Sequence, residues 1–256
     1  MFLILFPYMD TAVLVRGWLE DAGLTASAVA RRAGVSTSTM HRVLNGLVDP
    51  SIGTLEEIAI ACNTSLDLTT RPMSEPFAAA AARAMLEDGY KPPVSAGVDA
   101  WLDRLTHRTD SDDPVAVLEA AARASSPLRR PGAALFTGDV SVGRLASAGD
   151  ATRDAWAISG PAGLDLPGLS EPAPPTTLLW VDDAKAALSF LADSPLRPTH
   201  RPDRATVAVL AAEPELFEGT FNHGPVRYAA PTQILLDCIA QGGAPAARAL
   251  AEARSW

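Results

Sequence analysis

The stretch from Ala26 to Asn45 constrains the fold more than any other part of this chain of 256 residues. Thr25 has the side chain of a helix N-cap before Ala26–Ala33, and Ser36 has another before a helix that runs to about Asn45. Gly34 lies between these helices, where a left-handed backbone turn would end the first of them. The sequence therefore predicts two short, capped helices that meet at one glycine.

This stretch fits the helix-turn-helix unit position by position. Ala30 is the small residue expected where the two helices cross, and Gly34 is the turn. Val29 is expected to be buried between the helices. The core positions predicted for the unit are Ala30, Gly34, Val35, Met40 and Val43.

Helices are also predicted on both sides of this unit. Thr11–Asp21 has apolar residues at a helical period. Leu55–Cys62 forms a further helix, with Glu56 and Glu57 expected in its first turn, where the helix dipole favours negative charge. Ser65–Thr70 alternates like a short strand. Residues 9–72 are therefore predicted to form a separate, mainly helical domain.

Two sequence runs within this domain resemble a known family. The first is GVSxSTxxRxxNG at Gly34–Gly46, and the second is PSxxTLxxIAxA at Pro50–Ala61. Together they resemble the lambda-repressor/Cro-like (XRE family) DNA-binding domain, whereas the first run alone also resembles the Lac repressor family. The resemblance implies an all-α domain of five helices that binds double-stranded operator DNA and acts as a transcription regulator.

The second helix of such a unit points its N-terminal side chains into the major groove. The side chains expected to contact bases are Thr37, Ser38, His41 and Arg42. Arg42 can pair with O6 and N7 of guanine, and His41 can donate to a base or a phosphate. The side chains expected to contact phosphates are Ser27, Thr39 and Asn45. Alternatively, these polar residues have no DNA contact: Ser36 and Asn45 only begin and end the helix, and Thr39 only lies on the surface.

The charge of the chain limits how it can bind nucleic acid. The formal net charge is −9, which excludes a protein that coats DNA through general electrostatic attraction. The segment Met9–Asn63 contains four arginines and six acidic residues, but the acidic residues lie mainly on the flanking helices. A single domain of this kind would bind weakly, so we expect a homodimer that reads two half-sites.

The rest of the chain is predicted to be a helical connector at residues 73–126 and a mixed α/β domain at residues 127–256. The connector holds an alanine-rich helix at Glu75–Glu87, and a serine- and aspartate-rich joint at Thr109–Asp113. Clear strands are Thr177–Val181 and Thr206–Ala211. The helices expected in these regions are Val98–His107, Pro114–Ala124, Asp183–Leu191, Pro231–Ala240 and Ala244–Arg254. The fold class is α+β with several domains.

The segment Arg144–Pro161, a strand at Leu178–Asp182 and the segment Glu218–Asp237 resemble the AbiEi-type antitoxin domain. The resemblance rests on two motifs, AISG at Ala157–Gly160 and VRYAAPTQILLD at Val226–Asp237. The resemblance implies an antitoxin-like autorepressor of a type IV-like toxin–antitoxin pair. Its partner would be a nucleotidyltransferase-like toxin encoded by the neighbouring gene.

No catalytic residue, cofactor or metal is predicted. The chain lacks a phosphate-binding GxxxxGK[ST] loop and a GxSxG nucleophile motif. Asp182 and Asp183 could bind a metal ion, although Asp183 is better explained as a helix cap. Asp237 lies in an apolar helix and is expected to hold Arg227 or a backbone amide. The alternative function is a ligand-sensing regulator or an enzyme that carries a DNA-binding domain.

The N-terminal run Met1–Met9 is apolar, but it has no basic residues and is less than half of the roughly 20 residues that span a membrane. Residues 1–8 are interpreted as an extension from an upstream start codon, with an apolar arm that packs on the domain as the alternative. Cys62 and Cys238 are expected to be buried, reduced thiols. These features predict a cytoplasmic protein without membrane contact.

Overall fold

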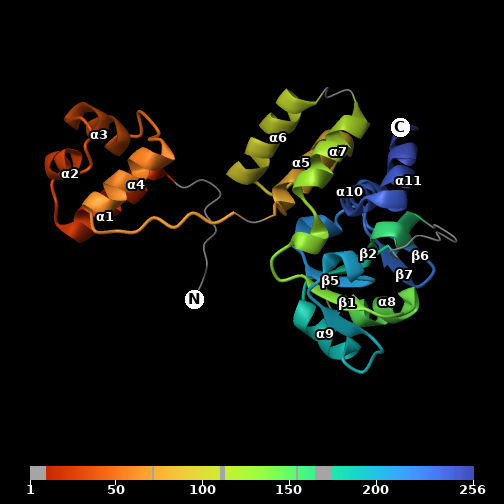
Figure 1. Ribbon diagram of the computed structural model, residues 1–256. Coiled ribbons are helices and arrows are strands. Elements are labelled where there is room, and N and C mark those ends of the chain that lie inside the picture. The colour runs from red at the N-terminus through yellow and green to blue at the C-terminus, as the bar shows by residue number, and fades with distance from the viewer. Residues whose placement is uncertain (1–9, 71, 110–112, 154, 165–174) are drawn as a thin grey trace. The chain divides into compact units, whose positions relative to one another are not determined.

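The computed structural model describes residues 10–70, 72–109, 113–153, 155–164 and 175–256, and the chain divides into two compact units (Figure 1). Unit 1 is Met1–Arg71 and unit 2 is Pro72–Trp256. The run Met1–Met9 and the centre of the joint Thr109–Asp113 lie outside the described residues, so the interpretations of both stay predictions. No helix in the described ranges is long and apolar enough to cross a lipid bilayer.

Unit 1 is helical. Its described residues form α1 (Thr11–Ala22), α2 (Ala26–Arg32), α3 (Thr37–Leu44) and α4 (Ile52–Ala61). These are four helices, so the fifth helix implied by the resemblance is not found among residues 10–70. The strand expected at residues 65–70 is also wrong, because this segment has no neighbouring strand in the described part of unit 1 to pair with.

Side-chain caps fix where these helices begin. Thr25 Oγ1 accepts a hydrogen bond from Ala28 N (3.3 Å), as expected for the N-cap of α2. The helix expected from Leu55 begins earlier, at Ile52, because Ser51 Oγ accepts from the backbone N–H of Thr54 (3.2 Å). The expectation that two glutamates occupy the first turn of this helix is therefore wrong.

The core of unit 1 contains the predicted helix-turn-helix residues. Val29, Ala30, Met40 and Val43 are buried and belong to one apolar cluster. Val35 is half-buried and packs against this cluster. Gly34 has φ +67°, the left-handed conformation predicted for the turn between α2 and α3.

We expect Gly34→Val to destabilise α2 and α3. A Cβ at this position would meet no atom within 4 Å, so the cost comes from the positive φ alone, about 1–2 kcal/mol. The change would appear as faster hydrogen exchange of the α2 and α3 amides in the full-length protein. Gly34→Asn is the matched control, because asparagine tolerates this conformation better than valine does. Equal protection in the valine variant would show that the turn carries no strain.

Unit 2 is built around one sheet with the strand order β4-β1-β5-β3-β2-β7-β6. The strands are β1 (Ala134–Thr137), β2 (Trp156–Ser159), β3 (Thr177–Val181), β4 (Arg197–Thr199), β5 (Val207–Ala211), β6 (Phe221–His223) and β7 (Val226–Tyr228). β3 and β5 are parallel, and α9 (Ala184–Leu191) follows β3, so the predicted strand, helix and strand are all present. The edge strand β4, which was not predicted, lies between α9 and β5 in the chain. β2 and β7 are also parallel, and the other neighbours are antiparallel.

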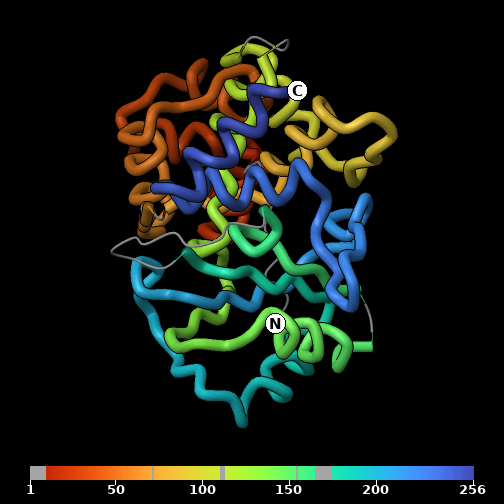
Figure 2. Tube along the Cα trace, turned by 90° about the vertical axis from the view of Figure 1, so that its right-hand side faces the viewer, coloured from red at the N-terminus to blue at the C-terminus, as the bar shows by residue number. Residues whose placement is uncertain are grey.

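Helices cover both faces of this sheet (Figures 1 and 2). The helices of unit 2 other than α9 are α5 (Pro76–Leu86), α6 (Ala96–Arg108), α7 (Pro114–Ala124), α8 (Val142–Asp150), α10 (Pro231–Gln241) and α11 (Gly243–Ala253). Leu179 and Val181 of β3 pack in a cluster with residues of α8 and α9. Leu178 and Trp180 lie on the other face, with η4 (Pro214–Phe217). Burial on both faces explains why β3 reads as a continuous apolar run.

The helices expected as a connector belong to the core of unit 2. Buried alanines of α5 and α7 share one apolar cluster with Ile234, Leu235 and Leu236 of α10. Leu105 of α6 is fully buried in the same cluster. Residues 72–256 are therefore one packed unit, and the boundary expected between residues 126 and 127 has no counterpart in the core.

A buried carboxylate joins α10 to the sheet. Asp237 accepts hydrogen bonds from Ser159 Oγ (2.6 Å), Trp180 Nε1 (2.9 Å) and Gln233 Nε2 (2.9 Å). The expectation that Asp237 holds Arg227 or a backbone amide is wrong, because its partners are these three side chains. Arg227 instead lies over the ring of Trp156, and its Cζ is 5.6 Å from the centroid of that ring.

The titration of Asp237 makes the stability of unit 2 depend on pH. Burial raises the pKa of Asp237 from 3.8 to about 6, against the opposing effect of its hydrogen bonds. The folded state thus holds this proton more tightly than the unfolded chain, so stability is gained below about pH 4 and lost as pH rises through about 6. We expect urea unfolding to show this loss in the wild type and not in Asp237→Asn. If the stability of both proteins depends on pH in the same way, Asp237 is not the source of the pH dependence.

Candidate nucleic-acid interface

The helix α3 has one buried side and one exposed side. Met40 and Val43 face the core, where they pack with Val29 of α2 and Val15 of α1. The four side chains predicted to contact bases are all exposed: Thr37, Ser38, His41 and Arg42. The structure therefore places the predicted base-contacting set together on the solvent side of one helix.

The N-terminus of α3 is fixed by a side-chain cap. Ser36 Oγ accepts from the backbone N–H of Thr39 (3.0 Å) and shares a further hydrogen bond with Thr39 Oγ1 (2.8 Å). The cap predicted at Ser36 is confirmed. Thr37 and Ser38 therefore lie in the first turn of a helix whose start is capped.

Arg42 and His41 are adjacent residues in the last turn of α3. The side chain of Arg42 makes no hydrogen bond or ion pair with any residue that the structure describes, so its guanidinium is available to a ligand. The ring of His41 is likewise without a hydrogen bond to the described part of the chain. These two side chains can therefore donate to base or phosphate acceptors without breaking an existing contact.

The three residues predicted to contact phosphates differ in exposure and in hydrogen bonding. Ser27 is exposed on α2. Thr39 is half-buried and is engaged in the cap with Ser36. Asn45 is exposed, but its Nδ2 donates to the carbonyl of His41 (2.7 Å). Asn45 thus ends α3, as expected if it has no DNA contact, whereas Thr39 takes part in the cap and does not simply lie on the surface. The phosphate contacts of all three residues stay predictions.

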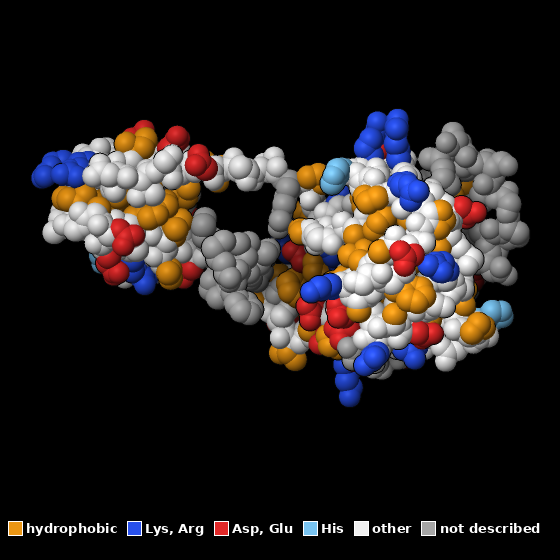
Figure 3. Space-filling model, turned by 90° about the horizontal axis from the view of Figure 1, so that it is seen from below, with side chains coloured by type: hydrophobic (Ala, Val, Ile, Leu, Met, Phe, Trp, Pro, Cys, Tyr) orange, Lys and Arg blue, Asp and Glu red, His pale blue; other side chains and the backbone are white. Residues whose placement is uncertain are grey.

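The exposed charges of unit 1 are unevenly distributed. Arg31 and Arg32 are exposed in the last turn of α2, close in sequence to Arg42 on α3. Exposed acids lie on the flanking helices, including Glu20 on α1 and Glu56 on α4. Figure 3 shows basic side chains at one end and at one edge of unit 1, with acidic side chains at several other places on the same face. α2 and α3 therefore form the basic part of this unit.

Arg16 of α1 makes a contact that no sequence motif indicates. In the structure, its Nε (2.9 Å) and Nη2 (2.7 Å) both donate to the carbonyl of Leu44, the last residue of α3. The two residues are 28 positions apart. No local sequence pattern reports a contact between a side chain and a backbone carbonyl so distant, and only the packing of α1 against α3 creates it.

The two acidic residues considered as metal ligands in unit 2 are Asp182 and Asp183. Asp183 caps α9 by accepting from Lys185 N (2.9 Å) and Ala186 N (3.1 Å), which confirms the helix-cap interpretation. Asp182 is exposed. Within the described ranges, no group of three or more His, Cys, Asp or Glu side chains is placed to hold a metal ion.

Comparison with known proteins agrees with the geometry of unit 1. Residues 12–71 match a family model described as a helix-turn-helix domain. No curated protein and no solved structure matches the chain. Unit 1 is thus a helix-turn-helix domain, which supports a DNA-binding regulator. No comparison supports the resemblance of unit 2 to the AbiEi-type domain.

Proposed function

We propose that this protein is a sequence-specific transcription regulator that reads double-stranded DNA with α3. The observation that carries the proposal is the exposed row of Thr37, Ser38, His41 and Arg42 on a helix whose other side is buried in the core. A capped helix with a polar, partly cationic outer face is what major-groove readout requires. The match to a helix-turn-helix family model supports the same function.

Specific binding needs more than one copy of unit 1. The chain has a net charge of −9, so general attraction to phosphates contributes little and base contacts must supply most of the selectivity. One helix that contacts a few bases binds weakly, whereas a homodimer doubles the contacts on a site with two half-sites. We therefore propose that the regulator binds its operator as a homodimer.

We also propose a more specific role for this regulator, that of an antitoxin-like autorepressor. It rests on the sequence resemblance of unit 2, and one structural observation is compatible with it: the two motif segments lie side by side. β2 pairs with β7 at Ile158 and Tyr228, and Ser159 donates to Asp237. A neighbouring reading frame with a nucleotidyltransferase motif would support this role, whereas a neighbourhood of metabolic enzymes would favour a ligand-sensing regulator.

The experiment that tests DNA reading is selection of binding sites from random duplexes by the full-length protein at a fixed salt concentration. The expected result is one enriched motif with two related half-sites. Recovery of unselected sequences only would refute the proposed function. Metal-dependent cleavage of the selected duplex, lost in Asp182→Ala, would instead support the alternative of an enzyme with a DNA-binding domain.

A further inference from the structure

The C-terminus of α3 has all of its terminal carbonyls hydrogen-bonded. A helix normally leaves its last four carbonyls without partners inside the helix. Here the chain that follows α3 supplies donors to three of them. Asn45 N bonds to His41 O (3.1 Å), Leu47 N to Arg42 O (2.8 Å), and Gly46 N to Val43 O (3.0 Å). The fourth carbonyl, that of Leu44, accepts from Arg16 of α1.

This last contact differs from the others because it comes from another helix. Two N–H groups of the Arg16 guanidinium converge on one oxygen, at 2.9 Å and 2.7 Å. Of the hydrogen bonds among the described residues of unit 1, these two are the ones that join α1 to α3. The positive charge also lies at the negative end of the α3 dipole, where a cation is stabilising.

We propose that Arg16 is a positioning residue that sets the orientation of α3 for base recognition, an inference that rests on the proposed DNA-reading function. The apolar contacts of Met40 and Val43 hold α3 on the core, but apolar contacts have little directional preference and allow small rotations or shifts. Two directional hydrogen bonds from α1 remove that freedom. They thereby fix the angle at which Arg42 and His41 are presented, and a bidentate base contact demands such accuracy.

The same residue could serve DNA binding in a second way, which the test must separate. Arg16 is exposed, and three of its five N–H groups are not used in the contact with Leu44. A direct phosphate contact would weaken binding to all sequences equally and lower the salt dependence of binding by about one unit of slope. A positioning residue would instead lower selectivity, and it would act through the side chains of α3.

A double-mutant cycle between Arg16 and Arg42 tests the proposal in the full-length protein. Affinities of wild type, Arg16→Ala, Arg42→Ala and the double variant are measured for the selected operator and for a scrambled duplex over a range of salt. We expect Arg16→Ala to lower the ratio of operator to scrambled affinity about fivefold to tenfold, with an unchanged salt slope. In the Arg42→Ala background, the same change should cost less than about twofold, because the contact it positions is already absent.

Two control variants accompany the cycle. Arg254→Ala removes the same charge from an exposed position in unit 2 and should leave the affinity ratio unchanged. Arg16→Lys keeps the charge but cannot place two fixed N–H groups on the carbonyl, so it should recover only part of the selectivity. Hydrogen exchange of the α3 amides, measured in each variant, establishes that unit 1 remains folded under the conditions of the assay.

The outcomes separate the inference from the function on which it rests. Additive losses in the two backgrounds, or a salt slope that falls by about one, would overturn positioning and assign Arg16 to phosphate. An unchanged affinity ratio in Arg16→Ala would also overturn it while leaving the proposed function intact. A wild-type protein that does not distinguish operator from scrambled duplex would refute the proposed function and the inference together.

Discussion

Arg42→Ala is expected to weaken specific operator binding strongly, to a level that can still be measured, while leaving unit 1 folded. Arg42 is exposed on α3, and its side chain has no hydrogen-bond partner among the described residues, so its removal costs the fold little. A lost bidentate contact to guanine costs about 1–3 kcal/mol in each half-site, and a dimer loses it twice. Titration of the selected operator at constant salt measures this loss, and thermal unfolding of the same variant reports the stability.

Binding to a scrambled duplex provides the control for this variant. Arg42→Ala should weaken scrambled binding far less than operator binding, because general attraction to phosphates depends on the sum of many charges. Unchanged operator affinity at the same salt concentration would show that α3 does not read the bases. An equal loss on both duplexes would instead assign Arg42 to phosphate.

The helix-turn-helix unit could be predicted because its signals are local. Ser36 and Thr25 cap helices within three residues of their own positions, and Gly34 shows a backbone conformation that few other residues adopt. The start of α4 was harder to predict, since Ser51 and Thr54 both have cap-forming side chains. In the structure they bond to each other, Ser51 being the cap.

The sheet of unit 2 could be predicted only in part. β3 and β5 have five residues each, a length at which an apolar, β-branched run is visible. β4, β6 and β7 have three residues each, too few to show any alternation. Their pairing is decided by contacts with strands far away in sequence, and such contacts leave no local pattern.

Buried polar side chains show the same limit. The need of Asp237 for a partner could be predicted from its apolar helix, but Ser159 and Trp180 lie 78 and 57 positions away from it. Arg83 gave no signal at all, because an arginine in an alanine-rich helix resembles a surface residue. In the structure its side chain is only 1% exposed.

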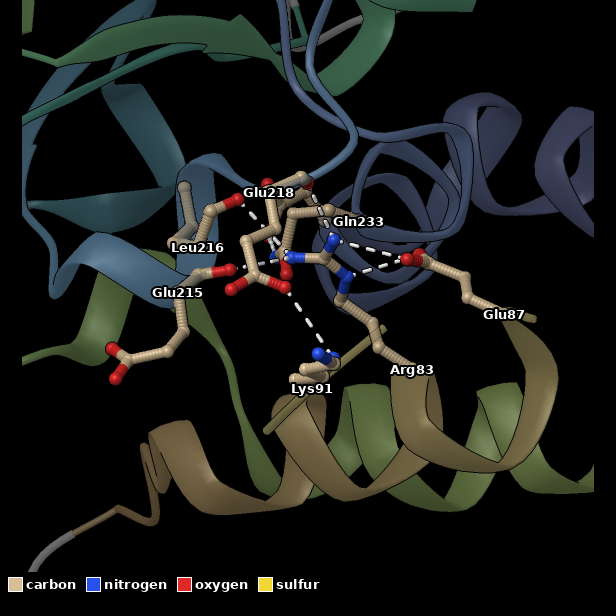
Figure 4. Close-up of polar contacts among 8 residues, drawn as sticks. Arg83, Glu87, Lys91, Glu215, Leu216, Glu218 and Gln233 are labelled. Carbon is tan, nitrogen blue, oxygen red and sulfur yellow. Dashed lines mark hydrogen bonds and ion pairs between the residues drawn. The ribbon is translucent and has the colours of Figure 1, made fainter. Parts of the chain in front are cut away.

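The guanidinium of Arg83 anchors η4 to α5 (Figure 4). Nε and Nη2 donate to the two carboxylate oxygens of Glu87, at 2.9 Å and 3.0 Å. Nη1 donates to the carbonyls of Glu215 (3.3 Å) and Leu216 (3.1 Å), and Nη2 donates to that of Glu218 (2.7 Å). The centroid of the Tyr90 ring lies 4.0 Å from Cζ of Arg83. Burial raises the pKa of Tyr90 to about 12.

Arg83→Met is accordingly expected to destabilise unit 2 by about 3–5 kcal/mol, since it leaves the Glu87 carboxylate and three backbone carbonyls without their donor. Urea unfolding of the full-length protein measures this loss. Arg123→Met is the matched control, because Arg123 also pairs with a glutamate four residues away but is 75% exposed. Its loss should stay below about 0.5 kcal/mol. Similar losses in the two variants would show that burial of the Arg83 cluster adds nothing, whereas partial recovery in Arg83→Met combined with Glu87→Leu would identify the unpaired carboxylate as the main cost.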